Sequence, residues 1–77
     1  MKNKLKLGIA GAGNIFKVAH APVLAVHSEI ELVAICDPIA DRAKQQAEQW
    51  GIPHFYTNYE EMLANHPDLN AIDICAP

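Results

Sequence analysis

The sequence predicts an α/β fold, in which a parallel sheet is covered by helices in a partial doubly wound arrangement. Apolar segments rich in strand-forming residues alternate with segments of helical periodicity along the 77 residues, and no linker, repeat or low-complexity stretch interrupts them. The apolar segments are continuous rather than alternating with polar residues, which is typical of strands buried on both faces. Because helical crossovers join strands in parallel through right-handed connections, we expect the strand order 3-2-1-4.

The first two strands are predicted at residues 4–10 and 30–37, the second around an unbroken apolar run at 32–36. The helical segment between them cannot be regular throughout. Pro22 has no backbone N–H and disfavours the helical conformation of the residue before it. We therefore expect a break in this segment at residues 20–22.

An amphipathic helix is predicted at residues 41–50. Ala43, Ala47 and Trp50 have the spacing of one helical face, and charged or amide side chains occupy the other side. Gly51 follows directly and is expected to end the helix as a left-handed cap.

The remaining elements are a short strand at residues 54–56, a helix that begins at Asn58, and a strand at 71–75. The Asn58 side chain can accept a hydrogen bond from an early backbone N–H, and Glu61 can reach back to complete a capping box. Pro67 is expected to lie beyond the end of this helix.

The two cysteines, Cys36 and Cys75, fall in the second and fourth predicted strands, which the first strand separates. Two strand spacings amount to roughly 9 to 10 Å, which is more than a disulfide spans. We therefore expect free thiols, a reducing compartment and a cytoplasmic location.

Composition and charge exclude several classes of protein. A net charge of −3 and a pI near 5.7 provide no electrostatic attraction for nucleic acid. No apolar run reaches the roughly 18 residues of a membrane span, and Asn14 and Lys17 interrupt the apolar segment that a secretory signal needs. His27, His54 and His66 are scattered without ligand spacing, so no metal site is predicted.

The most informative motif is the pair Gly11 and Gly13, which follows the first strand and precedes a helical segment. Glycines without a Cβ allow a diphosphate to approach the main chain and meet the free N–H groups of a helix start. Asp37 ends the next strand, near the distance at which a dinucleotide-binding unit places a carboxylate on the adenosine ribose. Two simpler readings stay open: the glycines serve only the turn, and Asp37 only caps a helix.

Six segments follow one another in a familiar order: GIAGAGNIF at 8–16, HAPVL at 20–24, ELVAICDP at 31–38, RA at 42–43, GI at 51–52 and NAIDICAP at 70–77. Together these segments resemble the amino-terminal Rossmann domain of the Gfo/Idh/MocA oxidoreductases. The third glycine of the usual dinucleotide motif is replaced by Phe16, which affects how the helix packs on the strand.

The resemblance implies hydride transfer between a nicotinamide cofactor and a secondary alcohol of a small-molecule sugar or polyol. It also implies a catalytic lysine in a Glu-Lys-Pro segment and a following α+β domain that binds substrate. The 77 residues contain no Glu-Lys-Pro segment. We therefore expect the chain to be the amino-terminal part of a dinucleotide-binding domain, without a catalytic residue and inactive alone.

The resemblance also assigns binding roles beyond Gly11, Gly13 and Asp37. Asn14 and Ile15 are implied as amide donors at the helix start, and Ala76 and Pro77 as residues beside the nicotinamide.

The cofactor choice follows from Asp37, whose charge would repel a 2′-phosphate, and from Pro38, which supplies neither charge nor donor. We therefore favour NAD over NADP. Arg42 leaves NADP open as the alternative.

Two other functions are alternatives to the dehydrogenase. A non-catalytic nucleotide-sensing module shares all of these features. An S-adenosylmethionine methyltransferase ranks last, because residues 5–10 lack the acidic residue usual in its first strand. Phe55, Tyr56 and Tyr59 are interpreted as core and rim rather than as a stacking surface. The open edge of the fourth strand predicts self-association or a homo-oligomer.

Overall fold

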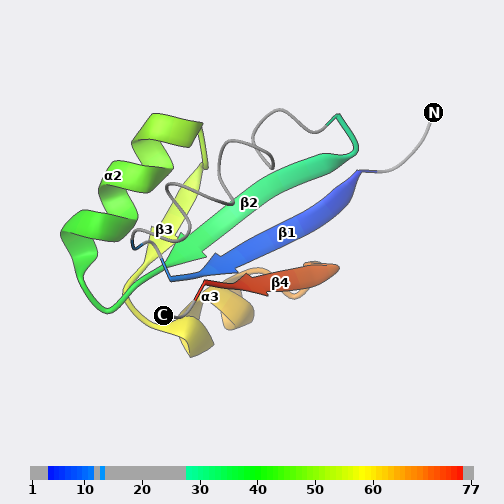
Figure 1. The fold of residues 1–77 in the computed structure, drawn as a ribbon. Coiled ribbons are helices and arrows are strands. Elements are labelled where there is room, and N and C mark those ends of the chain that lie inside the picture. The colour runs from blue at the N-terminus through cyan, green and yellow to red at the C-terminus, as the bar shows by residue number, and fades with distance from the viewer. Residues whose placement is uncertain (1–3, 12, 14–27, 76–77) are drawn as a thin grey trace.

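The fold is a four-stranded parallel sheet in the order β3-β2-β1-β4, as seen in a computed structural model that describes residues 4–11, 13 and 28–75. The predicted fold class and strand order are confirmed (Figure 1). The elements lie within one residue of their expected bounds: β1 Leu5–Ala10, β2 Ile30–Cys36, α2 Ala40–Trp50, β3 His54–Tyr56, α3 Tyr59–Asn65 and β4 Ala71–Ile74. The expected break at 20–22 and Phe16 lie outside the described residues.

The two helices of the described residues, α2 and α3, cover opposite faces of the sheet (Figure 1). On the α2 face, Ile9 and Ile35 are fully buried and share an apolar cluster with Ala47 of the helix. On the α3 face, Met62 is fully buried in a second cluster with Ala34 and with neighbouring apolar residues. Burial on both faces explains why the strands are continuous apolar runs.

An irregularity in β2 decides which face its last residues occupy. Leu7 of β1 pairs with Leu32, but the next residue of β1 pairs with Ala34, so Val33 has no partner in β1. One extra residue reverses the alternation of side chains beyond it. Ile35 consequently joins the α2 cluster and Cys36 joins the α3 cluster.

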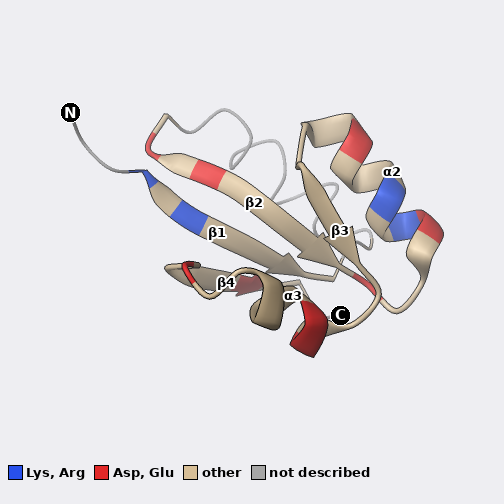
Figure 2. Ribbon diagram, turned by 180° about the vertical axis from the view of Figure 1, so that it is seen from behind, with Lys and Arg blue, Asp and Glu red and all other residues tan. Residues whose placement is uncertain are grey.

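Local sequence sets the helix ends as predicted. Gly51 has φ 68° and its N–H donates to the Ala47 carbonyl, so it is a left-handed cap of α2. The Asn58 carboxamide accepts from the Glu61 N–H at 3.1 Å and begins α3. Among the described contacts, the Glu61 carboxylate does not complete the capping box. Figure 2 shows that acidic residues gather in the first turn of α3, which suits the positive end of the helix dipole.

At the amino end of the sheet, polar groups fasten β4 beside β1. The Lys6 ammonium lies 2.8 Å from the Asp68 carboxylate, and the Lys6 N–H donates to the Asn70 side chain at 2.8 Å. The hydrogen bond from Lys6 lowers the pKa of the Asp68 carboxyl, and the same bond raises the pKa of the Lys6 ammonium. These groups are solvent-exposed and satisfy one another.

Cys36 and Cys75 are both free thiols, and β1 separates the strands that carry them. Burial raises the pKa of the Cys36 thiol. Burial, followed by the nearby Asp73 carboxylate, raises the pKa of the Cys75 thiol to about 12. Both thiols therefore remain protonated and unreactive near neutral pH.

Candidate cofactor-binding site

Gly11 lies where the carboxyl ends of three strands meet. Its N–H donates to the Cys36 carbonyl at the end of β2, at 2.8 Å. On the other side, the Cys75 N–H donates to the Ala10 carbonyl, also at 2.8 Å, and so draws the end of β4 against β1. The backbone of Gly11 is thus fixed between β2 and β4.

The fold itself requires a glycine at position 11. Gly11 has φ +107°, a conformation that side chains with a Cβ rarely adopt. A Cβ placed on it would lie 2.8 Å from the Cys75 carbonyl oxygen, closer than real Cβ atoms approach. Gly11 therefore serves the turn, whatever else binds there.

Gly13 differs, because no described residue forces it to be a glycine. Its φ does not fall in the positive region, and among the described residues an added Cβ would meet the end of the Arg42 side chain, 3.6 Å away, at ordinary contact distance. The contacts within the described part of the fold therefore do not explain why position 13 is a glycine.

Asp37 follows β2 directly and is only 5% exposed. Its carboxylate accepts from the Ile39 N–H at 2.8 Å, and its own N–H donates to the Tyr56 carbonyl at 3.0 Å. The N-cap of α2 is Ile39, which has no side-chain cap. Asp37 therefore shapes the turn before α2 and does not occupy the capping position of that helix.

Arg42, from the first turn of α2, lies beside both parts of the site. Its Nε is 3.5 Å from the Asp37 carboxylate, and the end of its side chain lies 3.6 Å from a Cβ built on Gly13. The guanidinium is half-exposed. The acid, the arginine and Gly13 are therefore neighbours at the carboxyl edge of the sheet.

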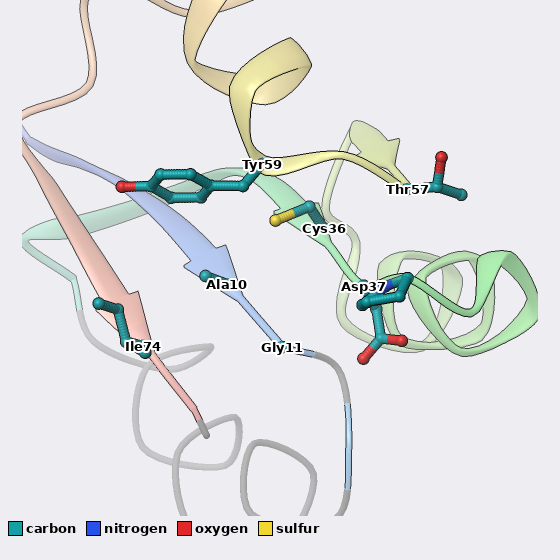
Figure 3. Close-up of a pocket in the computed structure, with 8 residues that line it drawn as sticks. Ala10, Gly11, Cys36, Asp37, Thr57, Tyr59 and Ile74 are labelled. Atoms are coloured by element: carbon teal, nitrogen blue, oxygen red, sulfur yellow. The ribbon is translucent and has the colours of Figure 1, made fainter. Parts of the chain in front are cut away.

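A cavity of about 420 Å³ opens at this edge (Figure 3). Asp37 is the charged member of an otherwise largely apolar lining, which is the usual composition of a small-molecule site. The described residues that line it are Ala10, Gly11, Cys36, Asp37, Pro38, Thr57, Tyr59 and Ile74.

Gly11 and Asp37, both predicted from the sequence as binding residues, line this cavity. The lining residues that follow β3 and the one that ends β4 were not predicted. Tyr59 is one of the aromatic residues that the sequence assigns to core and rim, and the sequence predicts no role for Thr57 or Ile74 in the site. The expected strand order could have predicted them, because the residues that follow parallel strands lie together at one edge of a sheet. Asn14, Ile15, Ala76 and Pro77 lie outside the described residues.

The described residues show neither a metal-binding cluster nor a membrane-spanning helix. In residues 4–11, 13 and 28–75, no three or more His, Cys, Asp or Glu side chains group in a way that could hold a metal ion. Within the same residues, no helix is long and apolar enough to cross a membrane.

Curated relatives are oxidoreductases. The chain is 32% identical to D-glucoside 3-dehydrogenase of Escherichia coli over 74 residues, covering 95% of the chain and 20% of that protein. It is 34% identical over its whole length to the oxidoreductase YrbE of Bacillus subtilis, covering 22% of that protein. The chain thus spans about a fifth of the length of these relatives.

Solved structures and a family match agree with them. Myo-inositol 2-dehydrogenase from Lactobacillus plantarum superposes with a TM-score of 0.84 and 29% identity, over 97% of the chain and 22% of that protein. A second similar structure is a variant of KijD10, a 3-ketoreductase from Actinomadura kijaniata, in complex with TDP-benzene and NADP. Its TM-score is 0.83 and its sequence identity 28%, over 97% of the chain and 23% of that protein. The Gfo/Idh/MocA family, described as an oxidoreductase family with an NAD-binding Rossmann fold, matches residues 5–77. The chain therefore belongs to the Gfo/Idh/MocA oxidoreductase family and carries its NAD-binding Rossmann fold.

Proposed function

We propose that the chain holds the adenosine and diphosphate portion of a nicotinamide dinucleotide for an oxidoreductase. One observation carries the proposal: the glycine turn at Gly11 and the buried carboxylate of Asp37 border the same cavity at the carboxyl edge of the sheet. Open α/β sheets bind their ligands at this edge.

The roles of the residues follow from their positions. Gly13 leaves the main chain open to the diphosphate, with Asn14 and Ile15 as further amide donors, and Asp37 accepts from the ribose hydroxyls. Ala76 and Pro77 are proposed beside the nicotinamide. The roles of these four residues outside the described part remain predictions.

The proposed reaction is hydride transfer between the cofactor and a secondary alcohol of a sugar or polyol. Relatives named for D-glucoside and myo-inositol oxidation support this substrate class. The cofactor supplies the redox chemistry. The chain contains no Glu-Lys-Pro segment, so we propose that it contributes binding without a catalytic group, and that it is inactive alone.

NAD is the proposed cofactor, because the Asp37 carboxylate would repel a 2′-phosphate. NADP is the second candidate. The half-exposed Arg42 guanidinium beside Asp37 supports it, as does the NADP bound in the structure of the 3-ketoreductase relative. The ratio of the dissociation constants for NAD and NADP distinguishes the two candidates.

Isothermal titration of the chain with NAD, NADP and S-adenosylmethionine tests the proposal. We expect NAD to bind more tightly than NADP, and S-adenosylmethionine not to bind. Gly13→Ala should weaken NAD binding about tenfold or more while leaving the urea unfolding midpoint nearly unchanged, because a Cβ there meets no described backbone. Gly13→Ala binding NAD as tightly as the parent chain would contradict the role given to this glycine.

We also propose that the chain occupies a reducing, cytoplasmic setting, which its two buried free thiols support. Self-association through the outer edge of β4 stays a prediction. Ile74 of this strand is exposed, which favours it. Analytical ultracentrifugation checks the prediction, and a monodisperse, cooperatively melting monomer would contradict it.

A further inference from the structure

Tyr59 is an exposed aromatic residue that neither core cluster uses. Tyr59 is the first residue of α3 and is 43% exposed. It lines the same cavity as Asp37. The position is fixed by the chain around it. The Asp37 N–H holds the end of β3 at the Tyr56 carbonyl, and Asn58 caps the helix that Tyr59 opens.

The described lining residues of β1 and β4, and the glycine that follows β1, are small or aliphatic. Ala10 and Gly11 form the end of β1, and Ile74 forms the end of β4. Figure 3 shows the Tyr59 ring extending from the start of α3 toward the β4 side, with the Asp37 carboxylate at another border of the cavity. The cavity therefore joins one carboxylate to a flat aromatic wall and an aliphatic one.

The ribose and the base of a nucleotide match this arrangement of a carboxylate next to apolar walls. In adenosine the base is attached directly to the ribose, so a ribose held by Asp37 places its base in the space next to that carboxylate. A planar base gains most from a planar aromatic neighbour, because every base presents a π-face. Tyr59 is the aromatic residue among the described lining.

We propose that the Tyr59 ring is the surface on which the adenine base of the cofactor stacks, with Ile74 behind the opposite face of the base. This inference rests on the proposed dinucleotide function and adds a contact residue to it. It also departs from the sequence-based interpretation of Phe55, Tyr56 and Tyr59 as core and rim rather than as a stacking surface. Stacking of one base on an aromatic side chain changes affinity by about 5- to 150-fold on alanine substitution.

The test compares NAD binding to the chain and to three variants. Tyr59→Phe keeps the ring and should bind NAD within about twofold of the parent chain. Tyr59→Ala should bind about tenfold more weakly, at the lower part of the range for base stacking. Phe55→Ala is the matched control, because Phe55 is 44% exposed and does not line the cavity, so its loss should leave the affinity unchanged.

A second measurement does not depend on any variant folding. Intermolecular NOEs between the Tyr59 ring protons and adenine H2 or H8 are expected in the complex of the parent chain with NAD. Absence of NAD binding by the parent chain would defeat the proposed function itself. NAD binding without these NOEs, or with an unchanged affinity in folded Tyr59→Ala, would overturn the role of Tyr59 alone.

Discussion

The two ends of the sheet use their polar groups differently. At the amino end, Lys6, Asp68 and Asn70 are exposed and satisfy one another across 2.8 Å contacts that fasten β4 to β1. At the carboxyl end, the Asp37 carboxylate is buried, is held by a backbone N–H, and borders a cavity. Exposed polar groups that pair with one another hold the fold at the amino end, whereas the acid at the carboxyl end is buried, lies 3.5 Å from the Arg42 guanidinium and borders the cavity.

The largest expected effect is that of Gly11→Ala, which should disrupt the packing of the first turn against β4 at the carboxyl edge of the sheet. The strained φ alone costs about 1 to 3 kcal/mol, and the Cys75 carbonyl must also move away from the new Cβ. We expect a marked fall in the urea midpoint together with the loss of NAD binding.

Gly51→Ala is the matched control for that substitution. Gly51 also has a positive φ, of 68°, but nothing lies within 4 Å of an added Cβ. Its cost should be limited to the conformation, about 1 kcal/mol. Equal losses of stability in the two variants would show that the contact of Gly11 with the end of β4 is unimportant.

The next effect concerns binding rather than stability. Asp37→Asn keeps an oxygen that can accept from the Ile39 N–H but removes the charge. Hydrogen bonds to a charged group contribute about 1.5 to 3 kcal/mol, so NAD should bind at least about tenfold more weakly. The preference for NAD over NADP should also shrink, since the repulsion of a 2′-phosphate is gone.

Asp68→Asn removes an acid from the amino end and should leave both dissociation constants unchanged. Titration calorimetry with NAD and NADP on the two variants measures the difference between the ends. If Asp68→Asn weakened binding as much as Asp37→Asn, the distinction between the two ends would be wrong.

The smallest expected effect is that of Lys6→Met. The pKa of Asp68 is lowered and that of Lys6 is raised by their mutual hydrogen bond. The pair therefore stabilises the fold between the ordinary carboxyl and lysine pKa values, roughly 4 and 10.4. Its contribution is lost as pH falls through the lowered pKa of Asp68, or rises through the raised pKa of Lys6.

We accordingly expect a slightly lower urea midpoint for Lys6→Met at pH 7 and little difference from the parent chain at pH 2. High salt should also reduce the difference, because both groups are exposed. A loss of the same size at both pH values would indicate that packing of the lysine stem, and not its charge, fastens this end.

The sequence predicted most of the fold because its signals are local. Continuous apolar runs mark buried strands, Gly51 ends a helix and Asn58 begins one. The extra residue at Val33 was not predicted, because a run that is apolar at every position gives no sign of which face each side chain occupies.

The candidate site was predicted in part. Asp37 and the glycines have a motif, whereas Tyr59 and Ile74 reach the cavity only through the pairing of distant strands. The distinction between Gly11 and Gly13 also needed the structure. The positive φ of Gly11 and the position of the Cys75 carbonyl show that the first glycine is required by the fold.

The most direct test of the account maps where ADP-ribose contacts the chain. In a ¹⁵N–¹H NMR titration, the amides of Gly11, Gly13 and Asp37 should shift with one dissociation constant, while those of Lys6 and Asn70 stay in place. Shifts concentrated at the amino end, or none at any position, would contradict the claim that the buried acid and the glycine turn form one dinucleotide site.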